Sequence, residues 1–173
     1  IDSWRTLFNS VKDQCIKIDK DLPRLIETNL IDVEKNWPKN LPSGIIHADL
    51  FSDNIFFQNK KFNGIIDFYF SCNDFYSFEI AICFNALCFD GQKHNLSFNV
   101  TKAKNFIDGY SSIRKLLDQE KESIKVLSQG AALRFLLTRV FDALNTVEGA
   151  IVKVKDPLEY LNRLEFHKNS KNY

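Results

Sequence analysis

The 173-residue chain carries 23 Lys and Arg side chains against 22 Asp and Glu, so its formal net charge is only +1. This balance excludes a bulk positive field that gathers nucleic acid or an anionic membrane surface, and we expect neither partner. With 45% hydrophobic residues, four Pro and six Gly, the composition is that of an ordinary globular domain and excludes disordered or collagen-like chains.

Two amphipathic helices are predicted at the start of the chain. Apolar side chains recur every three or four positions over residues 3–18, which is the period of one helix face. A second helix is predicted over residues 23–36, where Pro23 suits the first helical turn. Pro38 and Pro42 then end helical structure.

Short β-rich runs with polar punctuation occupy residues 45–70. Strand patterns lie over residues 45–47, 55–57 and 65–68, and the Asn59-Lys60-Lys61 segment predicts a hairpin turn. This region is therefore expected to form a small hairpin unit between helices.

The rest of the chain has a helical pattern. Residues 75–87 are apolar on nearly every face, which is typical of a helix buried in the domain interior. Further helices are predicted over residues 99–117, 120–142 and 156–166. The expected fold class is α+β and mainly helical, with a small β-hairpin region.

The segment HADLFSDN, residues 47–54, contains the most informative polar side chains. Asp49 is followed by Asn54 five residues later, and Asp67 comes thirteen residues after Asn54, within the strand pattern 65–68. Protein kinases use an Asp, an Asn and a second Asp at this spacing to accept the hydroxyl proton and to hold magnesium at the ATP phosphates. Carboxylate and amide oxygens are the ligands that magnesium prefers. The pattern therefore predicts a phosphotransferase catalytic loop, although Asp and Asn are also common turn residues.

Two neighbours in this loop receive different predictions. We expect His47 to orient the loop by hydrogen bonding rather than to exchange protons, and Asp53 to be a cap or a brace of the loop.

The nucleotide-binding parts of a kinase are missing from these 173 residues. No Gly-x-Gly loop occurs, and no Val-Ala-x-Lys strand supplies the lysine that grips the α- and β-phosphates. The chain also starts with Ile1 and contains no Met. We therefore expect residues 1–173 to be the C-terminal, catalytic lobe of a kinase-like enzyme, with the N-terminal nucleotide lobe upstream and little activity without it.

The motifs resemble one known family. The runs GIIHADLFSDN (44–54) and GIIDFYFSCND (64–74) are similar to the homoserine kinase branch of the aminoglycoside and choline phosphotransferase family. Agreement continues in AALRFLLTR (131–139) and before the last helix, so the resemblance extends over most of residues 41–166, while residues 1–40 carry no diagnostic motif.

This resemblance implies a protein-kinase-like fold and a reaction. ATP would phosphorylate the side-chain hydroxyl of L-homoserine, a small-molecule substrate, on the way to threonine. Asp49 would be the catalytic base, and Asn54 and Asp67 would bind Mg²⁺ at the ATP phosphates. We group His47 with Asp49 as a catalytic residue, in the orienting role given above.

The candidates for substrate binding are chosen by the charge of their side chains. Homoserine is a zwitterion, so its carboxylate needs a cation and its ammonium an acceptor. Asp74, Arg134 and Arg139 are the candidates; Gly130 and Ala131, one turn before Arg134, would leave room for a ligand.

Structural alternatives stay open for the same residues. Asp74 could cap the buried helix, and Arg139 could pair with Asp142. We expect a packing role for the aromatic run 68–70.

Three other functions remain open. A sister enzyme could phosphorylate choline or an aminoglycoside. A metal-dependent hydrolase could use His47, Asp49 and Asp67, although one histidine among oxygen donors is a poor zinc set. A non-catalytic kinase-like lobe is the third.

The cellular setting is predicted from what the sequence lacks. The longest strongly apolar stretch, residues 78–89, is too short to cross a bilayer, and no signal-peptide pattern occurs at Ile1. We therefore expect a cytoplasmic protein with cysteines that are reduced and mostly buried. The cysteines are Cys15, Cys72, Cys83 and Cys88.

Overall fold

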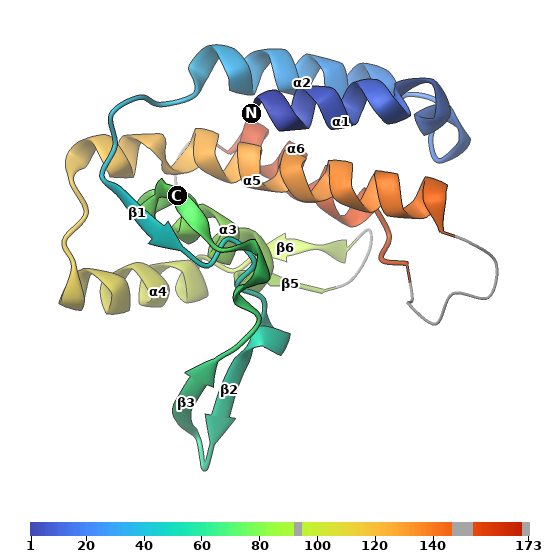
Figure 1. Ribbon diagram of the computed structural model, residues 1–173. Helices are drawn as coiled ribbons and strands as arrows, with labels where there is room; N and C mark the ends of the chain where they lie inside the picture. The colour runs from blue at the N-terminus through green and yellow to red at the C-terminus, as the bar shows by residue number, and fades with distance from the viewer. Residues whose placement is uncertain (92–94, 147–153, 171–173) are drawn as a thin grey trace.

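A long central helix organises the protein. The computed structural model describes residues 1–91, 95–146 and 154–170. Helix α5 (Asp118–Asn145) contacts α1 (Asp2–Val11), α2 (Leu22–Asn36), α3 (Tyr76–Leu87) and α6 (Leu158–Asn169). Figure 1 shows α1 and α2 side by side above α5. The interior positions of α5 are fully buried, among them Leu127, Leu133, Leu136 and Leu137. The expectation of a mainly helical α+β fold is therefore confirmed.

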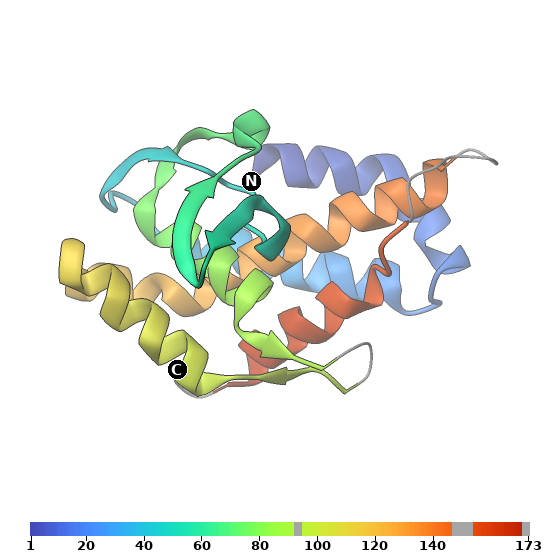
Figure 2. The same ribbon diagram turned by 90° about the horizontal axis from the view of Figure 1, so that it is seen from below.

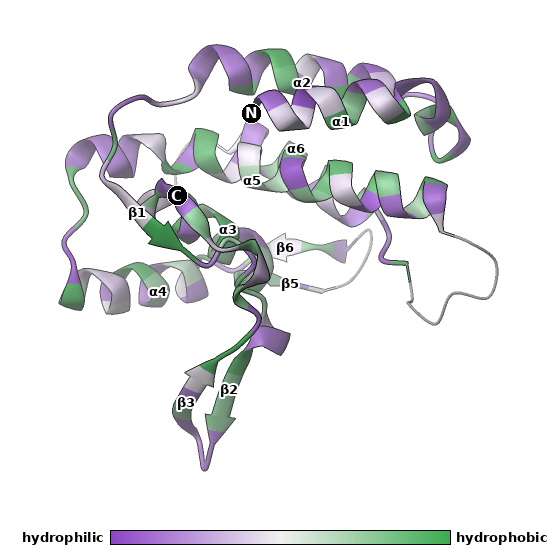
Figure 3. Ribbon diagram, viewed as in Figure 1, coloured by the Kyte–Doolittle hydropathy of each residue, from purple (hydrophilic) through white to green (hydrophobic). Residues whose placement is uncertain are grey.

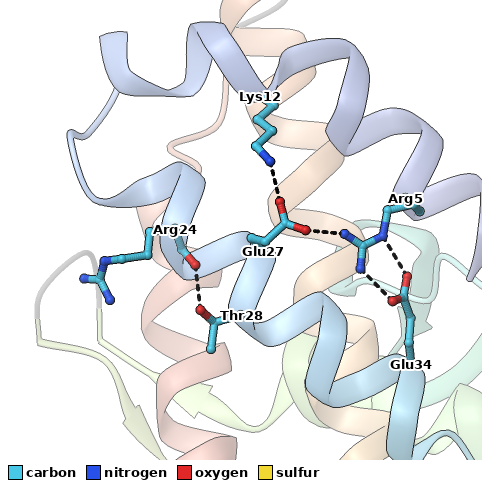
Figure 4. A network of polar contacts seen from close by, with 6 residues as sticks. All are labelled: Arg5, Lys12, Arg24, Glu27, Thr28 and Glu34. Atoms are coloured by element: carbon cyan, nitrogen blue, oxygen red, sulfur yellow. Dashed lines mark hydrogen bonds and ion pairs between the residues drawn. The ribbon is translucent and has the colours of Figure 1, made fainter.

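Polar contacts join α1 to α2 on the outer side of this layer (Figure 4). The Arg5 guanidinium contacts Glu34 at 2.6 Å and Glu27 at 2.5 Å, and the Lys12 ammonium contacts Glu27 at 2.6 Å. These side chains are partly exposed, so each pair contributes at most about 1 kcal/mol to stability. The buried apolar side chains between the helices, such as Phe8 and Leu30, contribute more.

Close packing of α5 against α2 depends on a glycine. A Cβ atom on Gly130 would lie 2.3 Å from the Trp37 ring, which also contacts Trp4 edge-on at 5.4 Å and Phe78 at 5.5 Å between centroids. The prediction that Gly130 leaves room for a ligand is therefore wrong, because the indole of Trp37 fills that space. Ala131 is fully buried as well.

This packing gives a stability prediction. Gly130→Ala is expected to lower the free energy of unfolding of the intact protein by about 1 to 3 kcal/mol, because overpacking outweighs the better helix propensity of alanine. Gly109→Ala is the matched control, since a Cβ there meets nothing within 4 Å, and it should raise stability by about 0.5 to 1 kcal/mol. Urea unfolding followed by circular dichroism measures both, and equal effects of the two variants would contradict the packing argument.

The strands form antiparallel pairs. Strand β1 (Ser43–Ile46) pairs with β4 (Cys72–Phe75), and β2 (Ile55–Gln58) pairs with β3 (Lys61–Ile65). Asn59 and Lys60 both have positive φ, at 51° and 62°, the conformation of a tight two-residue hairpin turn. The predicted hairpin is confirmed.

Most predicted helices are confirmed, with differences at their ends. The first region divides into α1 and a 3-10 helix, η1 (Lys12–Lys17), rather than one helix to residue 18. Helix α4 (Val100–Ile113) and helix α5 match their predicted segments, and the buried character of α3 is confirmed because Ala81, Ile82 and Cys83 have no exposed surface.

Three short strands were not predicted, namely β4, β5 (Phe89–Asp90) and β6 (Ser97–Phe98). Strand β4 has the sequence Cys-Asn-Asp-Phe, which lacks any strand pattern and is extended because it pairs with β1.

All four cysteines are free thiols; Cys15, Cys83 and Cys88 are buried, whereas Cys72 is exposed.

The β2–β3 hairpin and the segment after it expose much apolar surface. The hairpin projects from the helical body (Figure 1), which Figure 2 shows from below, and β2 is coloured largely hydrophobic in Figure 3. Tyr69 is 85% exposed, and Phe57 and Phe62 are more than half exposed. The expected packing role of residues 68–70 is therefore wrong for Tyr69. Phe68 and Phe70 are at least half exposed, but the Phe68 ring centroid lies 4.7 Å from that of His47 and the Phe70 ring centroid lies 5.9 Å from the Arg134 guanidinium.

Within the described residues, no helix has the combination of length and hydropathy that a membrane span requires.

Candidate active site

The loop after β1 turns sharply at Ala48. Ala48 has φ of 63°, and Asp67, which follows β3, has the same φ. A left-handed conformation at a non-glycine residue costs about 1 to 3 kcal/mol and persists only where the surroundings enforce it. Several hydrogen bonds enforce it here.

His47 braces the loop against the end of the hairpin. Its Nε2 lies 2.8 Å from the carbonyl oxygen of Ile66, and its Nδ1 accepts the backbone N–H of Asp49 at 3.3 Å. One neutral tautomer, with the proton on Nε2, satisfies both contacts. Both ring nitrogens are therefore used in positioning, which agrees with the role predicted for His47.

Glu79 was not identified by the sequence analysis. Its Oε2 accepts the N–H of Ala48 at 2.8 Å, whereas its Oε1 is buried without a hydrogen-bond partner in the described chain. Burial raises the pKa of Glu79, and the hydrogen bonds from the Ala48 and His47 backbone oppose this effect. The available signal was an acidic residue interrupting the apolar run of α3, but the sequence did not show which loop it reaches.

The three residues of the predicted catalytic pattern line one cavity of about 600 Å³, namely Asp49, Asn54 and Asp67. The Nδ2 of Asn54 donates to the carbonyl oxygen of Asp49 at 2.9 Å, which leaves its Oδ1 as a free oxygen ligand. The N–H of Ile66 donates to the Asn54 carbonyl at 3.1 Å, so the residue before Asp67 is tied directly to Asn54. The structure brings the pattern together.

Burial sets the protonation chemistry of Asp49. Desolvation raises its pKa above the ordinary 3.8, and the nearby Asp67 carboxylate adds to the rise. The positive charge of Arg134 is the largest opposing influence, followed by His47. A carboxylate with a raised pKa is a stronger base while it stays ionised at neutral pH.

Arg134 lines the cavity, and its guanidinium is hydrogen-bonded to the catalytic loop. Its Nη1 donates to the carbonyl oxygen of Ala48 at 2.5 Å, and its guanidinium lies 4.7 Å from the Phe135 ring centroid. Burial lowers its pKa, and Asp49 is the largest opposing charge. Arg134 therefore holds the loop and adds positive charge beside Asp49.

The other two substrate candidates differ in position. Arg139 lines the cavity, but its Nη1 contacts Glu159 and the carbonyl of Asp156, both at 2.9 Å. The alternative pairing of Arg139 with Asp142 is therefore wrong.

Asp74 is not among the cavity-lining residues. Its Oδ1 accepts the N–H of Phe75 at 2.7 Å, and α3 has no side-chain cap, so its capping alternative is not borne out either.

Sequence reasoning missed several residues of the cavity wall. Asp142 and Thr138 lie on the same side of α5 as Arg134, at intervals of four residues, and Lys155 lies shortly before α6. Helical spacing was the available signal for Asp142. Asp53 also lines the cavity and is exposed.

Transition-metal chemistry has no support in the described ranges, where no group of three or more His, Cys, Asp and Glu side chains gathers to hold a metal ion. Two protein oxygen ligands from Asn54 and Asp67 suit magnesium, which keeps waters and substrate phosphates in its other positions.

Comparisons with known proteins give a consistent result. Residues 7–116 match the profile described as the phosphotransferase enzyme family. A homoserine kinase of Mesorhizobium japonicum is 45% identical over 99% of this chain and 53% of its own length. Homoserine kinases of Rhodospirillum rubrum and Xanthobacter autotrophicus are 46% and 48% identical over 97% and 96% of this chain, and 51% of each relative. The chain spans about half the length of these curated relatives.

Proposed function

Because the chain belongs to the phosphotransferase enzyme family, we propose that the intact protein transfers the γ-phosphoryl group of ATP to the side-chain hydroxyl of L-homoserine. The observation that carries this proposal is the convergence of Asp49, Asn54 and Asp67 on one cavity. The names of the relatives, all homoserine kinases, support the choice of substrate.

Each of the three residues has a distinct role in this proposal. The Asp49 carboxylate accepts the proton of the substrate hydroxyl as the hydroxyl oxygen attacks the γ-phosphorus, and the bond from the γ-phosphorus to the β,γ-bridging oxygen breaks to release ADP. Asn54 Oδ1 and the Asp67 carboxylate would hold Mg²⁺ beside the ATP phosphates. Bound there, the metal ion supplies positive charge that stabilises the phosphoryl group during transfer.

The surrounding residues keep this arrangement in place. His47 accepts the backbone N–H of Asp49, and Glu79 accepts the backbone N–H of the preceding residue, Ala48. Arg134 fixes the Ala48 carbonyl from α5. Catalysis of phosphoryl transfer depends mainly on such positioning and on charge, which explains why three elements support one short loop.

We also propose that an upstream nucleotide-binding lobe completes the enzyme. The hairpin exposes apolar side chains, including Phe57 and Phe62, and lies in the sequence between the two proposed magnesium ligands. Exposed apolar surface of this kind is typical of a contact with another part of a protein. A two-stranded hairpin alone is only marginally stable in water. The length of the relatives, about twice that of this chain, supports the same interpretation.

A phosphate-transfer assay tests both proposals. The intact protein with Mg²⁺ and ATP is expected to phosphorylate L-homoserine in preference to choline and to an aminoglycoside, whereas residues 1–173 alone should not transfer phosphate. A preference for choline or the aminoglycoside would reject the proposed substrate, and no transfer to any acceptor would indicate a non-catalytic lobe. Full activity of residues 1–173 would reject the need for a second lobe.

A further inference from the structure

The cavity extends beyond the catalytic loop along α5, and this outer part has charged side chains with no assigned task. We propose that it recognises both charged groups of a free α-amino acid: Asp142 binds the α-ammonium group and Lys155 binds the α-carboxylate. The substrate hydroxyl then faces Asp49. This inference rests on the proposed function and adds the residues that would select the substrate.

Lys155 is the cavity cation whose charge is available. Arg134 donates to the Ala48 carbonyl beside Asp49, and the charge of Arg139 is paired with Glu159 at 2.9 Å. Lys155 has no ion pair or hydrogen bond to the described residues; its Nζ lies 5.4 Å from the ring centroid of Phe51. A carboxylate ligand therefore gains more from Lys155 than from either arginine.

Asp142 provides the complementary charge. It lies in the last turn of α5, its side chain is exposed, and its carboxylate contacts no partner in the part of the chain that the structure describes. The unpaired carbonyl groups at a helix C-terminus add negative potential there, which favours a bound cation. An ammonium group is the simplest ligand that would pair with the Asp142 carboxylate and be attracted by the negative potential at the end of α5.

The dimensions of α5 agree with a short amino acid. Arg134, which contacts the residue next to Asp49, and Asp142 are eight positions apart in α5, a rise of about 12 Å along the axis. Homoserine extends about 5 Å from its hydroxyl oxygen to its ammonium nitrogen. One hydrogen bond of about 2.8 Å at each end brings this span to about 10 or 11 Å, a length similar to the rise of α5 between Arg134 and Asp142.

Substrates lacking one charged group provide the test. The intact protein is assayed with L-homoserine, with 4-hydroxybutanoate, which lacks the ammonium group, and with 3-aminopropan-1-ol, which lacks the carboxylate. Asp142→Asn is expected to lower kcat/KM for L-homoserine about 10- to 100-fold and to leave kcat/KM for 4-hydroxybutanoate within about twofold. Lys155→Gln should lower kcat/KM for L-homoserine by a similar factor and leave kcat/KM for 3-aminopropan-1-ol within about twofold.

Two variants in α4 serve as controls for the charge changes. Asp108→Asn and Lys104→Gln alter exposed side chains of the same types that do not line the cavity, and both should leave all three values of kcat/KM unchanged.

The outcomes distinguish failure of this inference from failure of the proposed function. Equal losses with all three substrates, or a raised KM for ATP in Lys155→Gln with an unchanged KM for homoserine, would overturn the inference while leaving the proposed function intact. Absence of homoserine phosphorylation by the wild-type protein would overturn the proposed function and this inference with it. A loss confined to the two substrates that carry the ammonium group for Asp142→Asn, and to the two that carry the carboxylate for Lys155→Gln, supports both.

Discussion

Asp49→Asn in the intact protein is expected to lower kcat for phosphate transfer to L-homoserine by about 10²- to 10⁴-fold, the usual range for loss of a general base. Asparagine has nearly the same shape as aspartate, so the N–H contact from residue 49 to His47 and the loop around Ala48 should persist. The loss then reports the missing proton acceptor. Steady-state kinetics with Mg²⁺ and ATP measures it.

The pH dependence of the reaction distinguishes a base from a structural residue. Burial raises the pKa of Asp49 above 3.8, so activity of the wild-type protein should fall as the pH decreases through that raised value and the carboxylate is protonated. Asp49→Asn has no such group, and its residual kcat/KM should lack this acid limb. ATP affinity should change little, because the proposed metal ligands are Asn54 and Asp67.

An exposed residue provides the control for this variant. Asp108→Asn makes the same chemical change in α4, outside the cavity, and should retain wild-type kcat. Turnover of Asp49→Asn within tenfold of wild type, or an unchanged acid limb, would remove Asp49 from the role of base.

Local sequence pattern predicted the centre of this site. Asp49 and Asn54 are five residues apart in one loop, and Asp67 comes two residues after the adjacent hairpin, so short-range chain geometry brings all three together. The paired strand β4 and the contact of Glu79 with Ala48 depend on tertiary packing between segments about 30 residues apart. No local periodicity encodes such contacts.

The outer part of the cavity shows the same limit. Arg139 has an acidic residue three positions later, yet its partner is Glu159 on α6, because the packing of α6 against α5 decides which carboxylate is nearer. Gly130 was expected to leave room for a ligand, but Trp37, the residue that follows α2, fills that space. Residue type gave Asp74, Arg134 and Arg139 as candidates for binding a charged substrate, whereas the packing of α6 against α5 decides that Arg139 is paired with Glu159.

A buried histidine makes the fold sensitive to acid. His167 on α6 has no exposed surface, and its Nε2 lies 3.1 Å from Oδ1 of Asn85 on α3. The Phe98 and Phe166 rings lie within 6.0 Å of its imidazole centroid. Burial lowers the pKa of His167 to about 3, and the positive charges of Arg163 and Lys125 act in the same direction.

Proton linkage gives the sign and size of the effect. In the unfolded chain the imidazole binds a proton below about pH 6.5, whereas in the folded protein it stays neutral down to about pH 3. Between these values the unfolded state holds more protons, so the free energy of unfolding falls as the pH decreases. At pH 4 the loss from this residue is about 3 kcal/mol relative to pH 8.

His167→Gln isolates this contribution. A glutamine amide can still donate to Asn85 Oδ1 but does not titrate. The free energy of unfolding of the intact variant, measured with urea, should therefore fall by about 3 kcal/mol less than that of wild type between pH 8 and pH 4. The variant must be compared with wild type because protonation of carboxylates with a lowered pKa, such as Glu27, also reduces the stability of the protein in acid. Equal acid sensitivity of the two proteins, or an NMR titration of His167 near pH 6.5 in the folded state, would show that the imidazole is not held neutral between α3 and α6.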